Sequence, residues 1–444
     1  MTRASVANPH YLECFQRLER SLVGEPSWLG ELRRQAIASF ERVGLPTARK
    51  GNEPWKYTNV APIARTEFRR DGAATFDPAK LQRAAPWDDS WATVVFVNGR
   101  GAALPGPRTP ADLRLTDLLS ALGSDGSLSA QHLGRYASWE DDGFVALNTA
   151  FFGAGAFVQV APGAQIATPV HLVFATVGDG GPLVSYPRAL IVVGENSRLT
   201  LIETYVGLTR GSRHLTDAVT EVVLGEGAQV EHYRVLLEGD QAFHVGVTRV
   251  HQGRNSEFAS MVFQRGAALA RNDLRVALAA PGASCSLNGL YVTTRRQHID
   301  NYINIDHAQP HTTSRLYYKG ILDGASRAVF GGIVLVRPGA IRADAHQADK
   351  NLILSPQAEV DSKPSLEIYA DDVKCGHGAT AGAVAEDALF YLRSRGLDLH
   401  TASALLIRGF AGEVLETVGI VSLRRDLERR TMKALKGAAF AEGM

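Results

Sequence analysis

Short turns rich in glycine punctuate the middle of this chain and resemble one another. Between them lie short runs of β-branched residues, and no helical period persists from Phe144 to about Thr380. The first four turns recur at roughly thirty residues, a spacing typical of solenoids. The turns are VAPGAQI (Val160–Ile166), VGENSRL (Val193–Leu199), LGEGAQV (Leu224–Val230), HQGRNSEF (His251–Phe258), APGASCSL (Ala280–Leu287) and VRPGAIRA (Val336–Ala343).

One strand–turn–strand unit cannot bury its apolar face alone. Stacked units bury a continuous core and pair every strand with the next turn of the coil. We therefore predict a mainly β fold, with a parallel β-helix at residues 144–385. An N-terminal helical or mixed region at 1–143 and a C-terminal helical region at 386–444 flank it. The alternative is a β-sandwich, which shows evenly spaced strands but not similar turns at the same phase.

A solenoid has open ends, and an open end is an unpaired strand edge that recruits another chain. The predicted N-terminal helices offer a cover for one end. The other end needs either a cap or a partner. The fold itself therefore predicts assembly with a second protein.

Helical periodicity marks both ends of the chain. Residues 9 to about 45 carry one apolar stripe that Gly44 and Pro46 end. The aromatic segment Gly51–Val60 fits an extended strap over a core, and Thr93–Val97 predicts a strand. A helix is predicted at Glu386–Arg395, and another has Ala402, Leu405, Leu406, Phe410 and Val414 on one face. A third, Ser422–Lys436, has a basic outer face that we interpret as solvated.

Composition limits the classes of function. A formal net charge of +1 over 444 residues argues against a nucleic-acid binder. No apolar run approaches the roughly twenty residues of a membrane helix, and the first residues lack the apolar core of a signal peptide. Three scattered cysteines (Cys14, Cys285 and Cys375) form no disulfide framework. We expect a cytoplasmic protein that binds neither nucleic acid nor membrane.

The segment from Lys374 to His377 carries the strongest signal for chemistry. In a strand, residues two apart face the same side, so Cys375 and His377 can present to one point. Thiolate and imidazole suit iron, zinc or copper(I), and Lys374 is expected to lower the pKa of the thiol. Two ligands are too few for a closed site of four, so a metal would need donors from a partner chain. The alternative is a buried cysteine beside a hydrogen-bonded histidine.

A second group is rich in histidine, and its members are His298, Asp300, Asp306, His307 and His311. In a coil these residues lie on successive rungs, where polar ladders are commonly structural; a metal or acid–base role is the alternative. Cys285 is predicted to be a small core residue. The sequence contains no phosphate-binding loop and no CxxC motif, so any nucleotide hydrolysis must come from a partner.

Three stretches carry long motifs: NEPWKYTNV, HTTSRLYYKGILDGASRAVFGG, and KNLILSPQAEVDSKPSLEIYADDVKCGHGATAG followed by EDALFYLRSRG. With these motifs the chain resembles the SufB/SufD family of the bacterial SUF iron–sulfur cluster assembly machinery, in its SufD branch. The resemblance covers most of the chain. It implies a right-handed parallel β-helix that serves as a scaffold subunit and not as an enzyme.

The resemblance also implies partners and site residues. SufB and SufD pair through their β-helices, and each C-terminal domain docks one copy of the ABC-type ATPase SufC. It implies that His377 lies at the SufB–SufD interface, where it helps to build the nascent cluster, with Cys375 as its companion. Ala348 stands where SufB has a scaffold cysteine, so the chain resembles the subunit that supplies a histidine. Gly376 stands where serine is more usual.

Within this resemblance the expected cofactor is a transient iron–sulfur cluster in the complex. The isolated chain is expected to bind none tightly, and a flavin in the complex remains open. Amphipathicity suggests Ala402, Leu405, Leu406 and Phe410 for ATPase docking. Two other functions stay open: a structural homodimer without a metal role, and a β-helix carbohydrate-active enzyme, a class that gathers carboxylates along one face of the coil.

Overall fold

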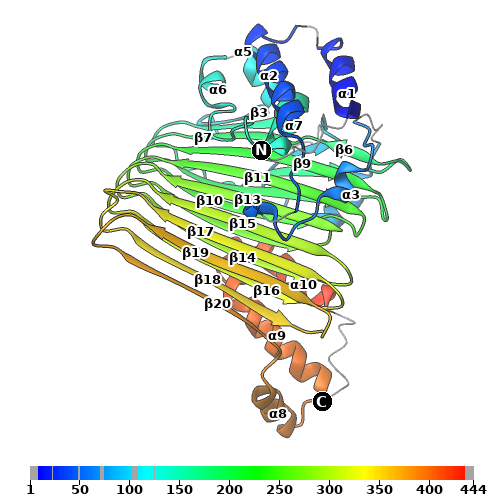
Figure 1. The fold of residues 1–444 in the computed structure, drawn as a ribbon, viewed down its shortest axis with the longest axis vertical. Helices are drawn as coiled ribbons and strands as arrows, with labels where there is room; N and C mark the ends of the chain where they lie inside the picture. Colours follow the sequence, from blue (N-terminus) through cyan, green and yellow to red (C-terminus); the bar gives the residue numbers. More distant parts are fainter. Residues whose placement is uncertain are drawn as a thin grey trace.

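The computed structural model describes residues 9–22, 24–48, 51–70, 75–102, 109–124 and 126–435. Helices lie toward both ends of the chain and strands fill its middle (Figure 1). The helices are α1 (Pro9–Glu19), α2 (Ser27–Val43), η1 (Glu53–Trp55), α3 (Ala61–Ala64), α4 (Pro78–Ala84), α5 (Leu118–Ser124), α6 (Gly126–His132), α7 (Gly143–Phe151), α8 (Glu386–Ser394), α9 (Leu399–Leu415) and α10 (Val421–Ala434).

The strands begin with β1 at Ala92–Val97, which confirms the strand predicted there. The others are β2 (Arg100–Ala102), β3 (Leu113–Asp117), β4 (Gly155–Val160), β5 (Val170–Thr176), β6 (Leu183–Ser185), β7 (Arg188–Val193), β8 (Arg198–Gly207), β9 (His214–Leu224), β10 (Gln229–Leu237), β11 (Ala242–Gln252), β12 (Glu257–Arg265), β13 (Leu269–Leu278), β14 (Ser284–Thr293), β15 (His298–His307), β16 (Thr313–Leu322), β17 (Arg327–Val336), β18 (Asp344–Ile353), β19 (Glu359–Ile368) and β20 (Lys374–Gly382).

The strands form two sheets that take alternate strands of the chain. The β20 sheet has the order β2-β1-β5-β8-β10-β12-β14-β16-β18-β20, and the β19 sheet has the order β19-β17-β15-β13-β11-β9-β7-β4-β3, with β6 beside β9. Neighbours are parallel except β1–β2 and β3–β4. Each coil therefore gives one strand to each sheet, which explains the thirty-residue spacing. The parallel β-helix is confirmed, and the antiparallel sandwich is wrong.

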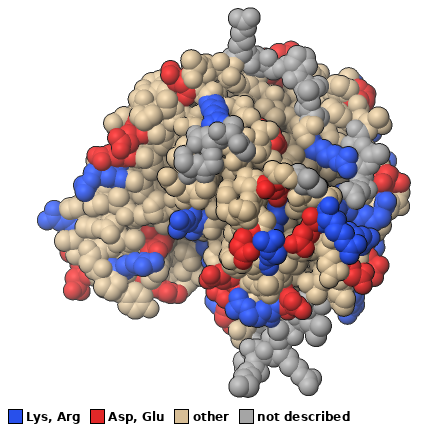
Figure 2. Space-filling model, turned by 90° about the horizontal axis from the view of Figure 1, so that it is seen from above, with Lys and Arg blue, Asp and Glu red and all other residues tan. Residues whose placement is uncertain are grey.

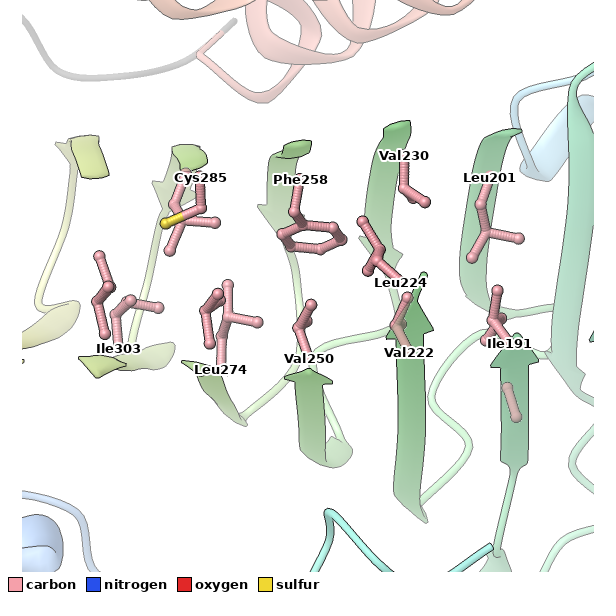
Figure 3. Packing of buried hydrophobic residues seen from close by; sticks show 14 of the residues in the cluster. Ile191, Leu201, Val222, Leu224, Val230, Val250, Phe258, Leu274, Cys285 and Ile303 are labelled. Atoms are coloured by element: carbon pink, nitrogen blue, oxygen red, sulfur yellow. The ribbon is translucent and has the colours of Figure 1, made fainter. Parts of the chain in front are cut away.

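The interior is filled by ladders of apolar side chains. Val230, Phe258 and Cys285 are in register on three successive strands of the β20 sheet, and Leu274 is in register with Ile303 in the β19 sheet. All of these residues are buried. Figure 3 shows the two ladders facing each other across the coil. Burying apolar surface stabilises a fold by roughly 25 cal/mol per Å². Each coil buries its apolar side chains against the next coil, so no unit is stable without its neighbours. Cys285 is a core residue, as predicted.

The glycine turns repeat because the turns themselves stack. Gly227 and Gly282 adopt left-handed φ values of 65° and 76°. A Cβ atom at either position would overlap the side-chain amide of an asparagine in the preceding turn, Asn196 or Asn255. Glycine meets both demands, since it tolerates positive φ and leaves the space that the stacked asparagine fills.

The N-terminal helices cover one end of the coil. In Figure 1, α1, α2 and α7 gather at the end that carries β3 and β7. Phe40 of α2 and Phe144 of α7 belong to a buried cluster that includes Leu190, Leu215 and Phe243 on the outer face of the β19 sheet. The helical stripe predicted for residues 9 to 45 is divided into α1 and α2.

The C-terminal helices pack on the outer face of the β20 sheet. Ile407 and Val414 of α9 and Leu427 of α10 share a buried cluster with Tyr233 and Phe263 of the sheet. Helix α8 instead contributes no buried residue. The predicted third helix is α10; its expected last residue, Lys436, lies outside the described residues.

The described surface carries both signs of charge. Figure 2 shows lysine and arginine interspersed with aspartate and glutamate on the face seen there. Among the described residues, every helix is too short or too polar to cross a bilayer.

Candidate functional site

The candidate site lies at the uncovered end of the coil. Strands β19 and β20 end their respective sheets, and each pairs on one side only. They lie away from the end that carries α1, α2 and α7 (Figure 1). Within the described part of the chain, this end thus presents two strand edges with unpaired backbone groups.

Cys375 and His377 occupy β20 itself, rather than the turn before it. Cys375 is in register with Ala345 and His377 with Gln347, both on β18. Ala345 and Gln347 are buried inside the coil. The two site residues therefore share the inward face, as predicted. Cys375 is half-buried against the interior cluster, whereas His377 is exposed.

The prediction that Lys374 lowers the pKa of the Cys375 thiol is wrong. Burial raises the pKa of Cys375, and its hydrogen bond with the backbone of Ala345 only partly opposes that rise. Lys374 is exposed on the outward face, because successive residues of a strand point to opposite sides. The thiol of Cys375 is therefore protonated at neutral pH, and the imidazole of His377 is the better candidate for a ligand.

The end of the coil holds no complete metal site of its own. Among the described residues, no group of three or more histidine, cysteine, aspartate or glutamate side chains could hold a metal ion. That donors would come from a second chain remains a prediction.

A polar network lies directly beneath this edge. Asp349 of β18 is 0% exposed and accepts hydrogen bonds from Ser362 Oγ at 2.7 Å and Asn351 Nδ2 at 2.7 Å. Tyr291 donates to Asn351 Oδ1 at 2.6 Å. Burial raises the pKa of Asp349 to about 6. Asp349 and Asn351 lie on β18, one strand inside β20, on the face that carries His377. Tyr291 lies on β14 and Ser362 on β19.

The second, histidine-rich group is dispersed and structural. His298 bonds Thr58 Oγ1 at 3.0 Å, so it helps to hold the aromatic segment Gly51–Val60 on the coil. This segment contains the short helix η1 and turns, so the extended strap predicted there is wrong. His307 bonds Thr312 and Ser314 at 2.8 Å each inside the coil. Asp306 pairs with Arg337. The structure thus favours the polar-ladder interpretation for these side chains.

The four residues suggested for ATPase docking differ in exposure. Ala402 is fully buried, and Phe410 packs under the ammonium group of Lys319 at 4.2 Å. Leu406 is half-buried, while Leu405 is 45% exposed. Leu405 lies in a groove of about 860 Å³ between α9 and α10. Of the four, Leu405 is therefore the residue that offers the most apolar surface to a partner.

The model of the family "SUF system FeS cluster assembly, SufBD core domain" matches residues 174–410, and "SufBD protein N-terminal region" matches residues 6–172. The chain belongs to the SufBD family. Members of the SufBD family function in iron–sulfur cluster assembly, which confirms the resemblance inferred from the motifs.

Individual SufBD relatives match over nearly their whole length. An iron–sulfur cluster assembly SufBD family protein of Synechocystis is 32% identical over 420 residues, which are 91% of each chain. SufD of Escherichia coli is 29% identical over 408 residues, covering 91% of this chain and 93% of its own. SufD of Bacillus subtilis is 27% identical over 444 residues, covering 96% and 97%.

Sequence reasoning missed the network beneath the SufBD edge. Gln347, Asp349 and Asn351 alternate with other residues in HQADKN, so they share one face of β18. The same face carries buried Ala345, and polar side chains at positions that a coil buries are a recognisable signal. The signal was readable only once the inward face of β18 was known.

Proposed function

We propose that this SufBD chain is a non-catalytic scaffold subunit for iron–sulfur cluster assembly in the cytoplasm. It pairs with a SufB-like chain through β19 and β20 and binds a SufC-type ATPase through its C-terminal helices. One observation carries the proposal: His377 and Cys375 lie on the inward face of an edge strand that pairs on one side only.

The edge is suited to pairing with a strand of another protein. Unpaired N–H and C=O groups along β19 and β20 accept a further strand, which gives affinity through main-chain hydrogen bonds. Beside them, Ile368 is 41% exposed and Tyr369 is 63% exposed. Exposed large apolar side chains next to open edges favour a protein partner over solvent. In isolation, the same edges would pair with a second copy.

Iron and sulfide are cargo in this proposal. A neutral imidazole is a good ligand for iron, so His377 supplies one ligand and the partner supplies the rest. Cys375 is a weaker candidate because burial raises the pKa of its thiol. The chain itself binds no cofactor tightly, and a flavin would belong to the assembled complex.

Changing His377 to alanine is expected to abolish cluster assembly while the complex still forms, because the imidazole is exposed and supports no core. Purified chain, SufB-like partner and SufC-like ATPase would be reconstituted with iron and sulfide. Cluster absorbance measures yield, and gel filtration measures assembly.

His346→Ala is the matched control for this experiment. The His346 side chain is 55% exposed and is in register with Gly376, but it lies on the outward face of β18. We expect this variant to retain full yield. Normal cluster yield from His377→Ala would refute the proposed role of the edge imidazole.

Leu405→Asp is expected to weaken ATPase binding at least tenfold, about the cost of placing one charge in an apolar contact. Titration calorimetry with the SufC-like ATPase measures the dissociation constant. Val421→Asp is the control, since Val421 is 48% exposed on α10 and does not line the groove. Equal affinities for the two variants would locate the docking surface elsewhere.

A further inference from the structure

The position of His377 depends on what holds β18. Strand β20 pairs with β18 and, within the described residues, with no other strand. Most residues of β20 beyond Cys375 and Gly376 are exposed, so little packing restrains the strand from outside. Whatever fixes β18 against the opposite sheet therefore also fixes the edge that carries the imidazole.

Two hydrogen bonds cross the interior at this last rung. Ser362 of β19 donates its hydroxyl to Asp349 Oδ2 at 2.7 Å. Gln347 Nε2 donates to the carbonyl oxygen of Ser365, also on β19, at 3.1 Å. Gln347 is the residue in register with His377, and Asp349 is in register with Ala379. The two bonds thus tie β18 to β19 directly beneath the site.

A third strand braces the same carboxylate. Tyr291 of β14 reaches Asn351 at 2.6 Å and Asp349 Oδ1 at 3.4 Å. Strand β16 lies between β14 and β18, and there the intervening residue is Gly320. A Cβ atom on Gly320 would overlap both the Tyr291 ring and the Asn351 amide. The glycine therefore lets the tyrosine hydroxyl reach across a strand.

These contacts do more than fill the core. Apolar ladders fill most of the interior, and apolar side chains would hold the sheets together here without burying a carboxylate. A hydroxyl–carboxylate contact also joins the two sheets in an earlier coil, where Thr220 of β9 donates to Glu203 of β8 at 2.8 Å. Hydrogen bonds differ from apolar contacts because they fix the lateral offset between strands as well as their separation. A hydrogen-bond network that joins β14, β18 and β19 next to the site is therefore suited to fixing the position of β18, and with it that of β20.

We propose that Asp349 is a positioning residue for His377. Held by Ser362, Asn351 and Tyr291, it fixes the offset between the two sheet edges, so that β20 presents the imidazole to the partner in one place. This inference rests on the proposed function, and it adds a buried residue, Asp349, on which that function depends besides His377. Asp349 itself touches neither cargo nor partner.

The test compares Asp349→Ala with Asp349→Asn in the reconstituted complex, since asparagine retains an oxygen that accepts the Ser362 bond. We expect the alanine variant to lose cluster yield about tenfold, in line with the large rate losses caused by small misplacements. We expect asparagine to restore at least half of the yield. Gel filtration should show intact complex for both.

A matched control removes a similar buried hydroxyl contact that is not part of the network around Asp349. Ser326→Ala breaks the Thr293–Ser326 bond of 2.9 Å and should leave yield unchanged. If Asp349→Ala does not fold, Ser362→Ala removes the same bond from the other strand and should lower yield. Wild-type yield in the variant that folds overturns the inference, and so does an asparagine variant as inactive as alanine.

His377→Ala separates the two levels of the proposal. If it retains full yield, the proposed function fails whatever Asp349 does. If it abolishes yield while the folded Asp349 or Ser362 alanine variant is normal, the function stands and the positioning role is wrong.

Discussion

Changing Glu221 to alanine is expected to lower the free energy of unfolding by about 3–5 kcal/mol. Glu221 projects from the outer face of β9 and is fully buried. It accepts a hydrogen bond from Arg188 at 2.5 Å and from the backbone N–H groups of Gly134, Tyr136 and Ala137. Without the carboxylate, a buried guanidinium and three N–H groups lose their acceptor.

The same change should loosen the N-terminal cover of the coil. The three N–H groups belong to the segment between α6 and α7, and Arg188 also donates to Asn148 and Thr149 on α7. Urea denaturation followed by circular dichroism measures the free energy of unfolding. Hydrogen exchange at residues 134–137 reports local loosening.

Two variants make this prediction specific. Glu221→Gln keeps one oxygen and the shape of the side chain, so it should lose less stability than alanine. The pair Arg188→Met with Glu221→Leu removes both charges and should recover part of the loss, as buried ion pairs replaced by apolar residues often do. A loss below about 1 kcal/mol in Glu221→Ala would mean that water reaches Arg188 and replaces the carboxylate.

Asp349→Asn is expected to stabilise the chain at pH 8 by about 1–3 kcal/mol. Burial raises the pKa of Asp349 from 3.8 to about 6. Between those pH values the folded state binds more protons at this site than the unfolded state, so stability falls as pH rises through that window. Above pH 6 the folded chain carries the full cost of a buried carboxylate, which asparagine removes.

The pH dependence distinguishes this cause from a change in packing. The difference in melting temperature between Asp349→Asn and wild type should be largest at pH 8 and shrink toward pH 5. Asp344→Asn on the same strand is the control, because the hydrogen bond from Arg315 lowers the pKa of Asp344. That variant should gain no stability at pH 8. A pH-independent gain from Asp349→Asn would contradict the titration of Asp349.

Much of the architecture could be predicted from local pattern. Similar glycine turns at a constant spacing required repeated coils, because a strand–turn–strand unit buries its apolar face only against a copy of itself. The alternation of strands also placed Cys375 and His377 on one face before any coordinates were known, since the side-chain period of a strand is two. Apolar residues at helical spacing likewise predicted α2, α8 and α9.

Sequence patterns were insufficient where contacts distant in sequence determine the pKa or the exposure of a side chain. Lys374 lies beside Cys375 in sequence but on the opposite face of β20, and the coil around the thiol raises its pKa. Ala402 and Phe410 share an apolar stripe with Leu405, yet Ala402 is fully buried and Phe410 packs under Lys319 of the β20 sheet, whereas Leu405 is exposed. A helical stripe shows that a face is apolar; it does not show what covers that face.

For this protein, the amino-acid sequence by itself determined the repeated coil, the shared face of Cys375 and His377, and the SufBD family. Only the tertiary structure decided that alternate strands form two sheets and that their last strands leave one end open. It also brought Tyr291, Asp349 and Ser362 together across 71 residues of chain. The physical reason is that periodicity is local, whereas the stacking of coils determines which distant side chains become neighbours.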